Sequence, residues 1–415
     1  MSLVEYKVGE LCSIKHGWAF AGEFFSDEGD YLLLTPGNAY MSGGIKIRPG
    51  KEKFYIGEFP KDYLLKKGDI LLILTDLVQE APLLGGSITI PEDNYFLHNQ
   101  RLGLVENVNT DLVDQRFLYH LFNSPLYRGQ VRGSASGATV RHTAPGRIYD
   151  CSVSIPQDLA TQKNISCLLD SIDELVENNN VITEKLDEIL SSTYQEWFIN
   201  FKFPNYEQVE FVDGIPEGWE LKSVSKLTQL ISRGITPKYN DESGKSIVIN
   251  QKCIRDNKLN LELARRQDKE IPDSKLVQKG DVLINSTGAG TLGRVTQVHE
   301  ALPDTTVDTH VTIVRPLQEI SSAWFGAAIS NIESYIETLG EGTTNQLELK
   351  REVIGRIDLV CPAIDIQNQF QKIVEPMQQQ ILNLMKQNTH LRKLKETLLP
   401  RLMSGELDVS KLSSI

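Results

Sequence analysis

The chain has 415 residues, more than a single hydrophobic core usually serves, so we expect at least two domains. Its 40% hydrophobic and 24% charged residues are typical of globular proteins and exclude a largely disordered chain. The formal net charge of −12 excludes DNA binding through overall positive charge, so such binding would need basic residues grouped on one face or a partner that contacts the phosphates.

The cellular setting follows from the cysteines and the apolar runs. Five scattered cysteines form no C-x-x-C pair, which favours reduced thiols in the cytosol over disulfides or a zinc ribbon. Residues 1–9 contain Glu5 and Lys7 and lack the apolar core of a signal peptide. No apolar run approaches the roughly 20 residues that cross a bilayer. We therefore expect a cytoplasmic protein without a membrane segment.

Residues 1–156 are predicted to form a β-rich domain. Short apolar runs such as Ile70 to Leu74 are separated by Gly, Pro and Asn, the pattern of strands joined by turns. Its glycine-rich loops carry basic, amide, hydroxyl and aromatic side chains, the groups that contact base edges and phosphates in DNA. The candidate DNA-binding residues here are Lys15, His16, Trp18, Asn38, Tyr40, Ser134, Ser136, Thr139, Arg141 and His142.

Residues 157–203 are predicted to form a long helix. Apolar residues recur at steps of three and four, the spacing of a coiled-coil seam. The predicted seam contains Ile165, Leu168, Ile172, Leu175, Asn179, Ile182, Leu186 and Ile189. An Asn on such a seam can determine register or partner choice at some loss of stability.

Residues 204–362 are predicted to form a second β-rich domain with similar loops. Gly288 to Gly293 matches G-x-G-x-x-G, but Arg294 to Val298 follows with the pattern of a strand. Because a dinucleotide fingerprint must open a helix, we interpret this stretch as a β-turn loop. The candidate DNA-binding residues here are Arg233, Thr236, Lys238, Tyr239, Asn250, Lys252, Arg255, Asn285, Thr287, Arg294, Thr343, Thr344 and Gln346.

Residues 363–415 are predicted to form a second long helix. Its seam contains Phe370, Val374, Met377, Ile381, Leu384, Asn388, Leu391, Leu398 and Leu402. Lys395 interrupts this row, and Pro376 is expected to kink the helix or to mark its true start.

The two halves of the chain share a faint repeat. Lys67-Gly68-Asp69 returns as Lys279-Gly280-Asp281, and three further matches follow in the same order. These are Asn99 to Val105 with Asp308 to Val314, Ser136 to Thr139 with Glu341 to Thr344, and Val153 to Pro156 with Leu359 to Pro362. We predict an α+β fold with a pseudo-twofold internal repeat. In this fold two β-rich globular domains are separated by two antiparallel coiled-coil helices of roughly 50 Å each.

The search for catalytic patterns favours a chain without an active site of its own. There is no phosphate-binding P-loop and no Asn/Asp-Pro-Pro-Tyr motif of amino-methyltransferases. The seven histidines have no metal-ligand spacing, and no nucleophile–base pair is evident. We predict no metal and no cofactor in this chain. Two alternatives remain open: a coiled-coil scaffold whose β-rich domains bind proteins or glycans, and an enzyme with an unrecognised site.

With these residues assembled, the chain resembles the specificity subunit of type I restriction–modification systems over nearly its whole length. The most specific stretch is the tail, Leu398-Leu399-Pro400-Arg401-Leu402-Met403-Ser404-Gly405-Glu406-Leu407. Further matching stretches are Gly17-Trp18-Ala19-Phe20, the Lys-Gly-Asp turns, Gly137-Ala138-Thr139, Trp197 to Phe201 and Gly214 to Trp219.

The resemblance implies two target recognition domains, each binding one half of a split DNA site, and helices that set the spacer length. It also implies two methyltransferase subunits that carry S-adenosylmethionine and dock on the helices, and ATP-driven restriction subunits. Both cofactors, and Mg²⁺, would then belong to the partners. Since recognition domains of this family vary widely in sequence, the resemblance does not identify which residues of this chain contact bases.

Overall fold

The computed structural model describes residues 2–41, 43–47, 50–342 and 347–409. Contacts group the chain into two units: unit 1 comprises 1–178 and 387–415, and unit 2 comprises 179–386. Helices α5 (Leu159–Tyr194) and α10 (Ile364–Met403) each contribute one part to each unit. The four-part division at residues 156, 203 and 362 remains a prediction. Within the described ranges, no helix is both long and apolar enough to span a bilayer.

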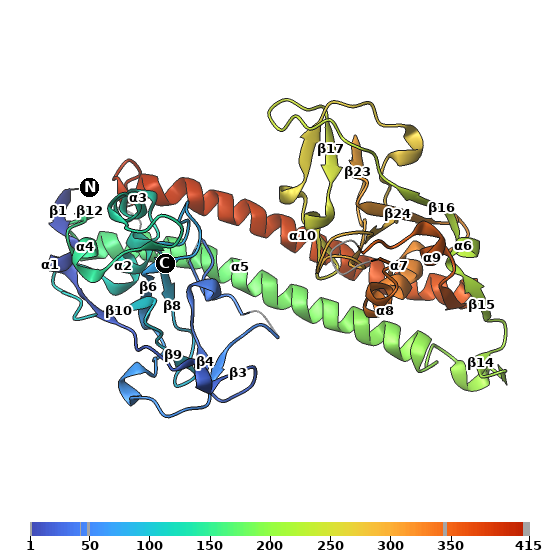
Figure 1. Cartoon of the computed structure of the whole chain (residues 1–415), viewed down its shortest axis with the longest axis horizontal. Coiled ribbons are helices and arrows are strands. Elements are labelled where there is room, and N and C mark those ends of the chain that lie inside the picture. The colour runs from blue at the N-terminus through green and yellow to red at the C-terminus, as the bar shows by residue number, and fades with distance from the viewer. Residues whose placement is uncertain (1, 42, 48–49, 343–346, 410–415) are drawn as a thin grey trace. The chain divides into compact units, whose positions relative to one another are not determined.

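Unit 1 is built around an antiparallel sheet with the strand order β2-β10-β6-β8. Its strands are β2 (Ser13–His16), β6 (Ile70–Ile73), β8 (Ser87–Thr89) and β10 (Leu102–Glu106). Every residue of β6 is buried because both faces of the sheet are covered. Leu72 packs into the core beneath α2 (Gln115–Phe122), and Leu71 packs against Leu32 and Phe96 on the opposite face. Figure 1 shows α2 on one side of β6 and β10, with β4 and β9 on the other.

Smaller elements complete unit 1. A second sheet has the order β3-β5-β4-β9, with β4 and β9 parallel, and β1 pairs with β12 at the domain boundary. The bounds are β1 (Leu3–Lys7), β3 (Phe25–Ser26), β4 (Leu32–Leu33), β5 (Phe54–Tyr55), β7 (Thr75–Asp76), β9 (Phe96–Leu97), β11 (Arg141–His142), β12 (Ser152–Pro156), α1 (Val8–Leu11), α3 (Pro125–Ser134) and α4 (Pro145–Tyr149).

Unit 2 has the same plan. Its main sheet has the order β16-β24-β21-β22, a second sheet contains the parallel pair β17 and β23, and β15 pairs with β25. The Gly288–Gly293 stretch forms the turn from β21 to β22, so the interpretation as a β-turn loop is confirmed. Figure 1 shows β17 and β23 on one side of β24, and α7 and α8 on the other.

The strands of unit 2 are β13 (Phe211–Val212), β14 (Ile215–Pro216), β15 (Glu220–Ser223), β16 (Thr228–Arg233), β17 (Ser246–Ile249), β18 (Ile254–Arg255), β19 (Lys258–Leu259), β20 (Arg265–Gln267), β21 (Val282–Asn285), β22 (Val295–Gln297), β23 (Thr305–Val307), β24 (Val311–Pro316) and β25 (Asp358–Cys361). Its shorter helices are α6 (Val224–Leu227), α7 (Ser322–Asn331), α8 (Glu333–Thr338) and α9 (Arg351–Gly355).

In each unit the first part of one long helix packs against the last part of the other. In unit 1, Ile165 and Leu169 of α5 share a core with Leu399 and Leu402 of α10. In unit 2, Phe370 of α10 packs against Tyr194 of α5 and Phe198 of the π-helical turn that follows. Because the N-terminal part of each helix meets the C-terminal part of the other, the predicted antiparallel pairing and the α+β class are confirmed.

The predicted α5 seam needs a correction at alternate positions. Leu175 and Ile182 are 46% and 45% exposed, whereas Leu169 and Thr183 are buried. The buried row therefore contains residues 165, 169, 172, 179 and 183. Residues 169 and 183 replace the predicted 168 and 182, each one position later in the chain. The sequence pattern could not distinguish the two rows, because leucine or β-branched residues occupy the predicted positions (Leu168, Ile182) and the buried ones (Leu169, Thr183). Of the other predicted spacer residues, Ile165, Ile172, Asn179, Ile381, Leu384 and Asn388 are buried, while Leu186 and Leu391 are half-buried.

The α10 predictions change at two residues. Pro376 does not mark the start of the helix, because α10 begins at Ile364. Pro376 is exposed, whereas Phe370 and Val374 of the preceding turns are buried in the core of unit 2. The kink remains a prediction. Lys395 does not interrupt the buried row: its side chain is 8% exposed, and its ammonium lies 2.6 Å from the Asp173 carboxylate.

Candidate nucleic-acid interface

The Lys-Gly-Asp turns have the same hydrogen bonds in both units. Gly68 and Gly280 have φ values of +88° and +94°, a backbone region that favours glycine. The Asp69 carboxylate accepts a hydrogen bond from the Lys66 N–H at 2.9 Å, and the Asp281 carboxylate accepts one from the Gln278 N–H at 2.8 Å. The N–H groups of Gly68 and Gly280 donate to the carbonyls of Ile90 and Val298. Positions of the two main sheets can therefore be matched one to one.

Four chain segments meet at one end of the main sheet of unit 1. We call this end rim 1 and define it as residues 16–18, 74–76, 99–101 and 136–143. Strands β2 and β6 end here, and β10 begins here. Backbone hydrogen bonds join the segments. The turn after β2 is bonded to the segment before β10 from Gly17 N–H to the Leu102 carbonyl (3.2 Å) and from Gln100 N–H to the Trp18 carbonyl (3.0 Å). The segment after β6 is bonded from Leu74 N–H to the Arg101 carbonyl (2.9 Å) and from Thr143 N–H to the Leu74 carbonyl (2.9 Å), and His142 N–H donates to the Ser136 carbonyl (2.9 Å).

The equivalent end of unit 2 gathers the equivalent segments. We call it rim 2 and define it as residues 233–235, 285–288, 308–310, 341–342 and 347–349. The joining bonds run from Gly234 N–H to Val311 carbonyl (3.2 Å), Ser286 N–H to His310 carbonyl (2.8 Å), Leu349 N–H to Ser286 carbonyl (2.9 Å) and Glu341 N–H to Glu348 carbonyl (3.0 Å). The chain thus builds one loop arrangement twice.

Each rim depends on a glycine where two backbones touch. A Cβ on Gly17 would lie 2.0 Å from the Asn99 carbonyl oxygen, and a Cβ on Gly234 would lie 1.9 Å from the Val307 carbonyl oxygen. No side chain fits at such distances, so glycine is required for close approach rather than for an unusual φ. These contacts place the turn after β2, and the segment after β16, against the segment before the next strand of the sheet.

Several candidate side chains of rim 1 are free to meet a ligand. His16, Ser136, Thr139 and His142 are exposed, and Trp18 is half-buried. The Thr75 hydroxyl lies 3.0 Å from Nδ1 of His142 and so orients that ring. In rim 2 the hydroxyl of Thr287, which is half-buried, lies 2.7 Å from Nδ1 of the exposed His310.

Two candidate arginines hold the rim loops in place. Arg141 donates from its guanidinium to the Arg132 carbonyl at 2.9 Å. Arg233 donates to the carbonyls of Thr309 and Leu349 and forms an ion pair with Glu348, each at 2.9 Å. Burial lowers the pKa of Arg233 from its ordinary value. These two arginine side chains therefore stabilise the conformation of the rim loops through hydrogen bonds to backbone carbonyls.

Four buried polar atoms in or beside the rims have no hydrogen-bond partner among the described residues. Asn285 is fully buried; its amide donates to the Gln251 carbonyl at 3.0 Å, but its Oδ1 has no partner among the described residues. The same holds for Gln251 Oε1 beside rim 2 and for Arg141 Nε and Thr143 Oγ1 in rim 1. Because buried polar groups are nearly always hydrogen-bonded, these four atoms are able to accept or donate one further hydrogen bond.

Other candidates of unit 1 lie away from its rim. Asn38 is buried, and its amide bonds to Thr35 and to the Glu52 carboxylate, so it holds its own loop. Tyr40 is 49% exposed on that loop. Ser134 closes α3, where its hydroxyl donates to the Val131 carbonyl. Lys15 lies on β2, with its ammonium 4.8 Å from the centre of the Tyr63 ring.

The remaining candidates of unit 2 fall into two groups. Thr236, Lys238 and Tyr239 lead toward β20, where the Arg265 guanidinium stacks 3.7 Å from the Tyr239 ring centre. Asn250 caps the turn that contains Lys252, Arg255 is exposed on β18, and Arg294 donates to the Gly290 carbonyl at 2.7 Å. Thr343, Thr344 and Gln346 lie outside the described residues.

The rims also contain four exposed side chains that are not among the predicted candidates: Gln100, Arg101, Thr309 and His310. All four follow a buried Asn or Asp in the turn before β10 or β24. The repeat between Asn99 to Val105 and Asp308 to Val314 contained the information needed to find them, because it marked both turns as equivalent.

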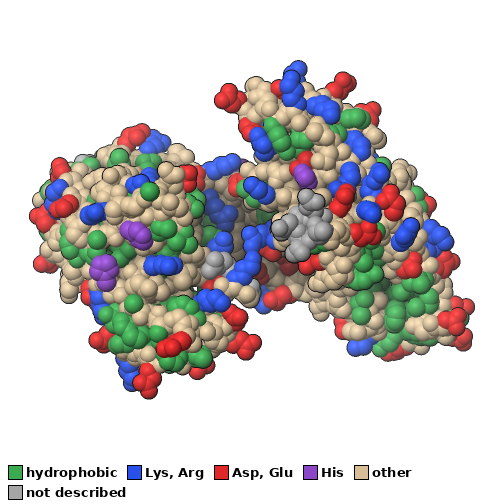
Figure 2. Space-filling model, viewed as in Figure 1, with side chains coloured by type: hydrophobic (Ala, Val, Ile, Leu, Met, Phe, Trp, Pro, Cys, Tyr) green, Lys and Arg blue, Asp and Glu red, His purple; other side chains and the backbone are tan. Residues whose placement is uncertain are grey.

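Charged side chains of both signs lie on the face of each unit that Figure 2 shows. Figure 2 shows Lys and Arg side chains mixed with Asp and Glu over the visible face of each unit. The net charge of −12 agrees with this mixture.

His120, Asp170 and Asp173 of unit 1 are close enough together to hold a metal ion, but neighbouring cations already neutralise them. His120 Nε2 and Arg116 Nε lie 2.8 and 3.1 Å from the Asp170 carboxylate, and Lys395 pairs with Asp173. Burial raises the pKa of Asp170, but the bonds from His120 and Arg116 outweigh it and lower the pKa to about 2. We interpret the cluster as an ion-pair network that joins α2, α5 and α10.

Comparisons with known proteins agree with the resemblance seen in the sequence. Residues 2–188 match the family model described as the type I restriction modification DNA specificity domain. The chain is 26% identical over 371 residues to the type I restriction enzyme MjaIX specificity subunit of Methanocaldococcus jannaschii, covering 84% of this chain and 80% of that protein. It is 24% identical over 482 residues to the HindI specificity subunit of Haemophilus influenzae, covering 97% and 99%.

A solved structure has the same fold. The S subunit of a type I restriction-modification system from M. genitalium matches with a TM-score of 0.62 at 17% identity, covering 97% of this chain and 96% of that one. Residues 2–188 thus match the model of the type I restriction modification DNA specificity domain, and nearly the whole chain is similar in sequence to specificity subunits of type I restriction enzymes.

Proposed function

We propose that the chain is the sequence-specific DNA-recognition subunit of a type I restriction–modification complex, with no active site of its own. One observation carries the proposal: the two rims share backbone bonds but present different side chains. Rim 1 exposes His16, Gln100, Arg101 and His142, whereas rim 2 exposes Thr309 and His310. One scaffold with two different surfaces suits a bipartite target in which each domain binds its own half-site.

The long helices would set the spacer between half-sites and dock two methyltransferase subunits. Restriction subunits would join for cleavage, and S-adenosylmethionine, ATP and Mg²⁺ would be held by the partners. The acidic chain supports a role for partners, because contacts to DNA phosphates supply much of the affinity of DNA-binding proteins. The complex would act in the cytoplasm.

Methylome sequencing of a host that expresses the chain with a methyltransferase partner tests the function directly. The expected result is methylation at one split sequence. Replacing residues 204–362 with the corresponding domain of another family member should change one half-site only. If both half-sites changed, or if no sequence were selectively methylated or bound, the proposal would be wrong.

The spacer role has its own test. Deleting one heptad from each long helix, in facing positions, keeps the buried rows aligned and shortens the pair by about 10 Å. We expect a changed spacer length with unchanged half-sites. New bases in either half-site would contradict the spacer role while leaving DNA recognition intact.

A further inference from the structure

Unit 2 contains a cavity of about 400 Å³ that no function above uses. All of its lining residues belong to unit 2; they come from α5, α7, α10, the β18–β19 hairpin and the chain around and after β22. Most of its wall is apolar, with Leu190, Leu259, Leu302, Phe370 and Leu382 among the lining side chains. A cavity of this size with an apolar wall and a few polar groups is typical of a small-molecule site.

The internal repeat shows which positions of unit 1 correspond to the cavity. Helices α2 and α7 begin with equivalent caps: the Asp114 side chain accepts from Phe117 N–H, and the Ser321 side chain accepts from Trp324 N–H. The backbone N–H of each cap donates to a buried glutamine, Gln162 at 2.8 Å and Gln367 at 3.0 Å. These bonds match α2 to α7 and α5 to α10 residue by residue.

In this alignment Tyr119 corresponds to Gly326, His120 to Ala327, Asp173 to Gln378 and Lys395 to Leu190. All four unit 2 residues line the cavity. In unit 1 the four side chains fill the equivalent place. Tyr119 is 4% exposed and His120 is fully buried. Lys395 pairs with Asp173, and its ammonium lies 5.9 Å from the centre of the Tyr119 ring.

Unit 1 thus ties its recognition domain to both long helices with its own aromatic ring and ion pair. Unit 2 lacks these side chains, and a cavity lies where they would be. A Cβ on Gly326 would lie 2.2 Å from Gln297 Oε1, so Gln297 occupies part of the space. The rest stays open between Ala327, Leu190 and Gln378.

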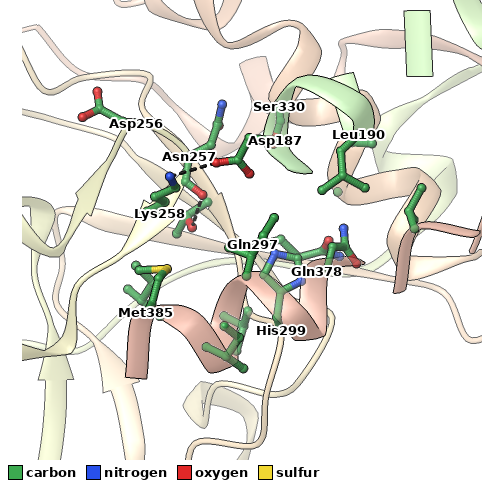
Figure 3. A pocket seen from close by; sticks show the side chains of 18 of the residues that line it. Asp187, Leu190, Asp256, Asn257, Lys258, Gln297, His299, Ser330, Gln378 and Met385 are labelled. Atoms are coloured by element: carbon green, nitrogen blue, oxygen red, sulfur yellow. Dashed lines mark hydrogen bonds and ion pairs between the residues drawn. The ribbon is translucent and has the colours of Figure 1, made fainter. Parts of the chain in front are cut away.

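The cavity also presents hydrogen-bonding groups. Figure 3 shows Gln297, His299 and Gln378 gathered on one side and the Asp187–Lys258 pair on the other, where the two charges lie 2.8 Å apart. Among the described residues, none bonds to the His299 imidazole. Burial lowers the pKa of His299 to about 4, so its ring is neutral near pH 7 and can both donate and accept a hydrogen bond.

We propose that this cavity binds a small planar aromatic molecule, whose ring takes the place that Tyr119 fills in unit 1 and whose polar edge meets His299. Such a ligand contacts α5, α10 and the recognition domain together, so it stabilises unit 2 as the built-in network stabilises unit 1. The proposal rests on the repeat and on the cavity, and it is independent of DNA binding.

Calorimetric titration of the full-length chain with indole, without DNA or partners, tests this proposal. Indole is planar and carries one N–H that can donate to a neutral imidazole. We expect saturable 1:1 binding and a rise in melting temperature. The non-planar cyclohexylmethanol should bind at least tenfold more weakly. Absence of saturable indole binding would overturn the proposal.

Variants locate the site. Ala327→Phe places a ring in the cavity and should weaken indole binding at least tenfold while raising the melting temperature of the free chain. Gln369→Phe, an exposed position on α10 outside the cavity lining, is the matched control and should bind indole normally. If Ala327→Phe does not fold, Leu382→Trp fills the cavity from α10 with the same expectation. Normal indole binding by a folded cavity-filling variant would place the ligand elsewhere and refute the site.

A third variant tests the polar edge. His299→Leu keeps much of the side-chain volume but removes the hydrogen-bonding nitrogens. It should weaken binding of indole about tenfold and leave binding of naphthalene, which has no polar edge, unchanged. Equal loss for both compounds would show that His299 supports only the shape of the cavity, contradicting its proposed contact.

Discussion

The Thr75 hydroxyl lies 3.0 Å from Nδ1 of His142 and orients an exposed imidazole at rim 1. Thr287, at the equivalent position of rim 2, makes the same kind of contact to His310 at 2.7 Å. The histidines come from different segments, His142 from strand β11 and His310 from the turn before β24. The equivalent threonines thus orient a histidine in both rims, although the histidine comes from a different segment in each rim.

Replacing His142 with Ala should weaken binding of the complete complex to its DNA about tenfold, because a contact to a base edge contributes about 1–3 kcal/mol. The loss should appear with changes in one half-site only. Filter binding against a set of single-base variants measures this. His390→Ala, an exposed histidine on α10, is the matched control. Equal loss in both half-sites would argue for a structural effect.

Arg101→Ala should reduce the dependence of affinity on salt. The Arg101 side chain is exposed and forms no ion pair with another described residue, so it is free to contact a phosphate. Losing one phosphate contact should lower the slope of log affinity against log salt by about 1. Arg356→Ala, exposed at the end of α9, should leave the slope unchanged. An unchanged slope for Arg101→Ala would exclude this contact.

Gly17→Ala and Gly234→Ala should each destabilise the chain by about 1–3 kcal/mol, because the added methyl group would overlap a carbonyl oxygen of the neighbouring segment. Urea unfolding followed by circular dichroism measures the free energy of unfolding. Gly22→Ala is the control, since a Cβ there meets nothing within 4 Å. Wild-type stability for both variants would show that the rims adjust without strain.

Lys395→Met should destabilise unit 1 by about 1–3 kcal/mol, because Asp173 loses its partner within a largely buried contact. Thermal unfolding measures the change. The double variant Lys395→Met with Asp173→Leu removes both charges and should recover much of the loss. If the double variant were no more stable than the single one, the ion pair would not be the cause.

Asp170 should make stability fall in acid. Its pKa of about 2 in the folded chain is below the value of about 3.9 expected for an unfolded chain. The stabilisation is therefore complete above about pH 4 and is lost as the pH falls toward 2. The stability difference between wild type and Asp170→Asn should shrink across this range in urea titrations. A difference that stays constant with pH would contradict the shifted pKa.

The repeated plan, the two long helices and the positions of the turns could be predicted without any structure. Local rules suffice for these, since a Lys-Gly-Asp turn needs a glycine at positive φ and a helix seam needs apolar residues at steps of three and four. The family resemblance rested on such local stretches, above all the tail from Leu398 to Leu407.

Which loop residues share a surface, and which rows of the helices are buried, became known only from contacts in the folded chain. Asn38 and His142 looked alike as loop residues, but packing buries the first and exposes the second. Leu168 and Leu169 are neighbours in sequence, but Leu169 is fully buried in the core of unit 1 and Leu168 only partly. The cavity is the clearest case: no sequence pattern marks Ala327 until the repeat is aligned through hydrogen bonds distant in the chain. Contacts between residues far apart in sequence depend on shape complementarity, which local periodicity does not encode.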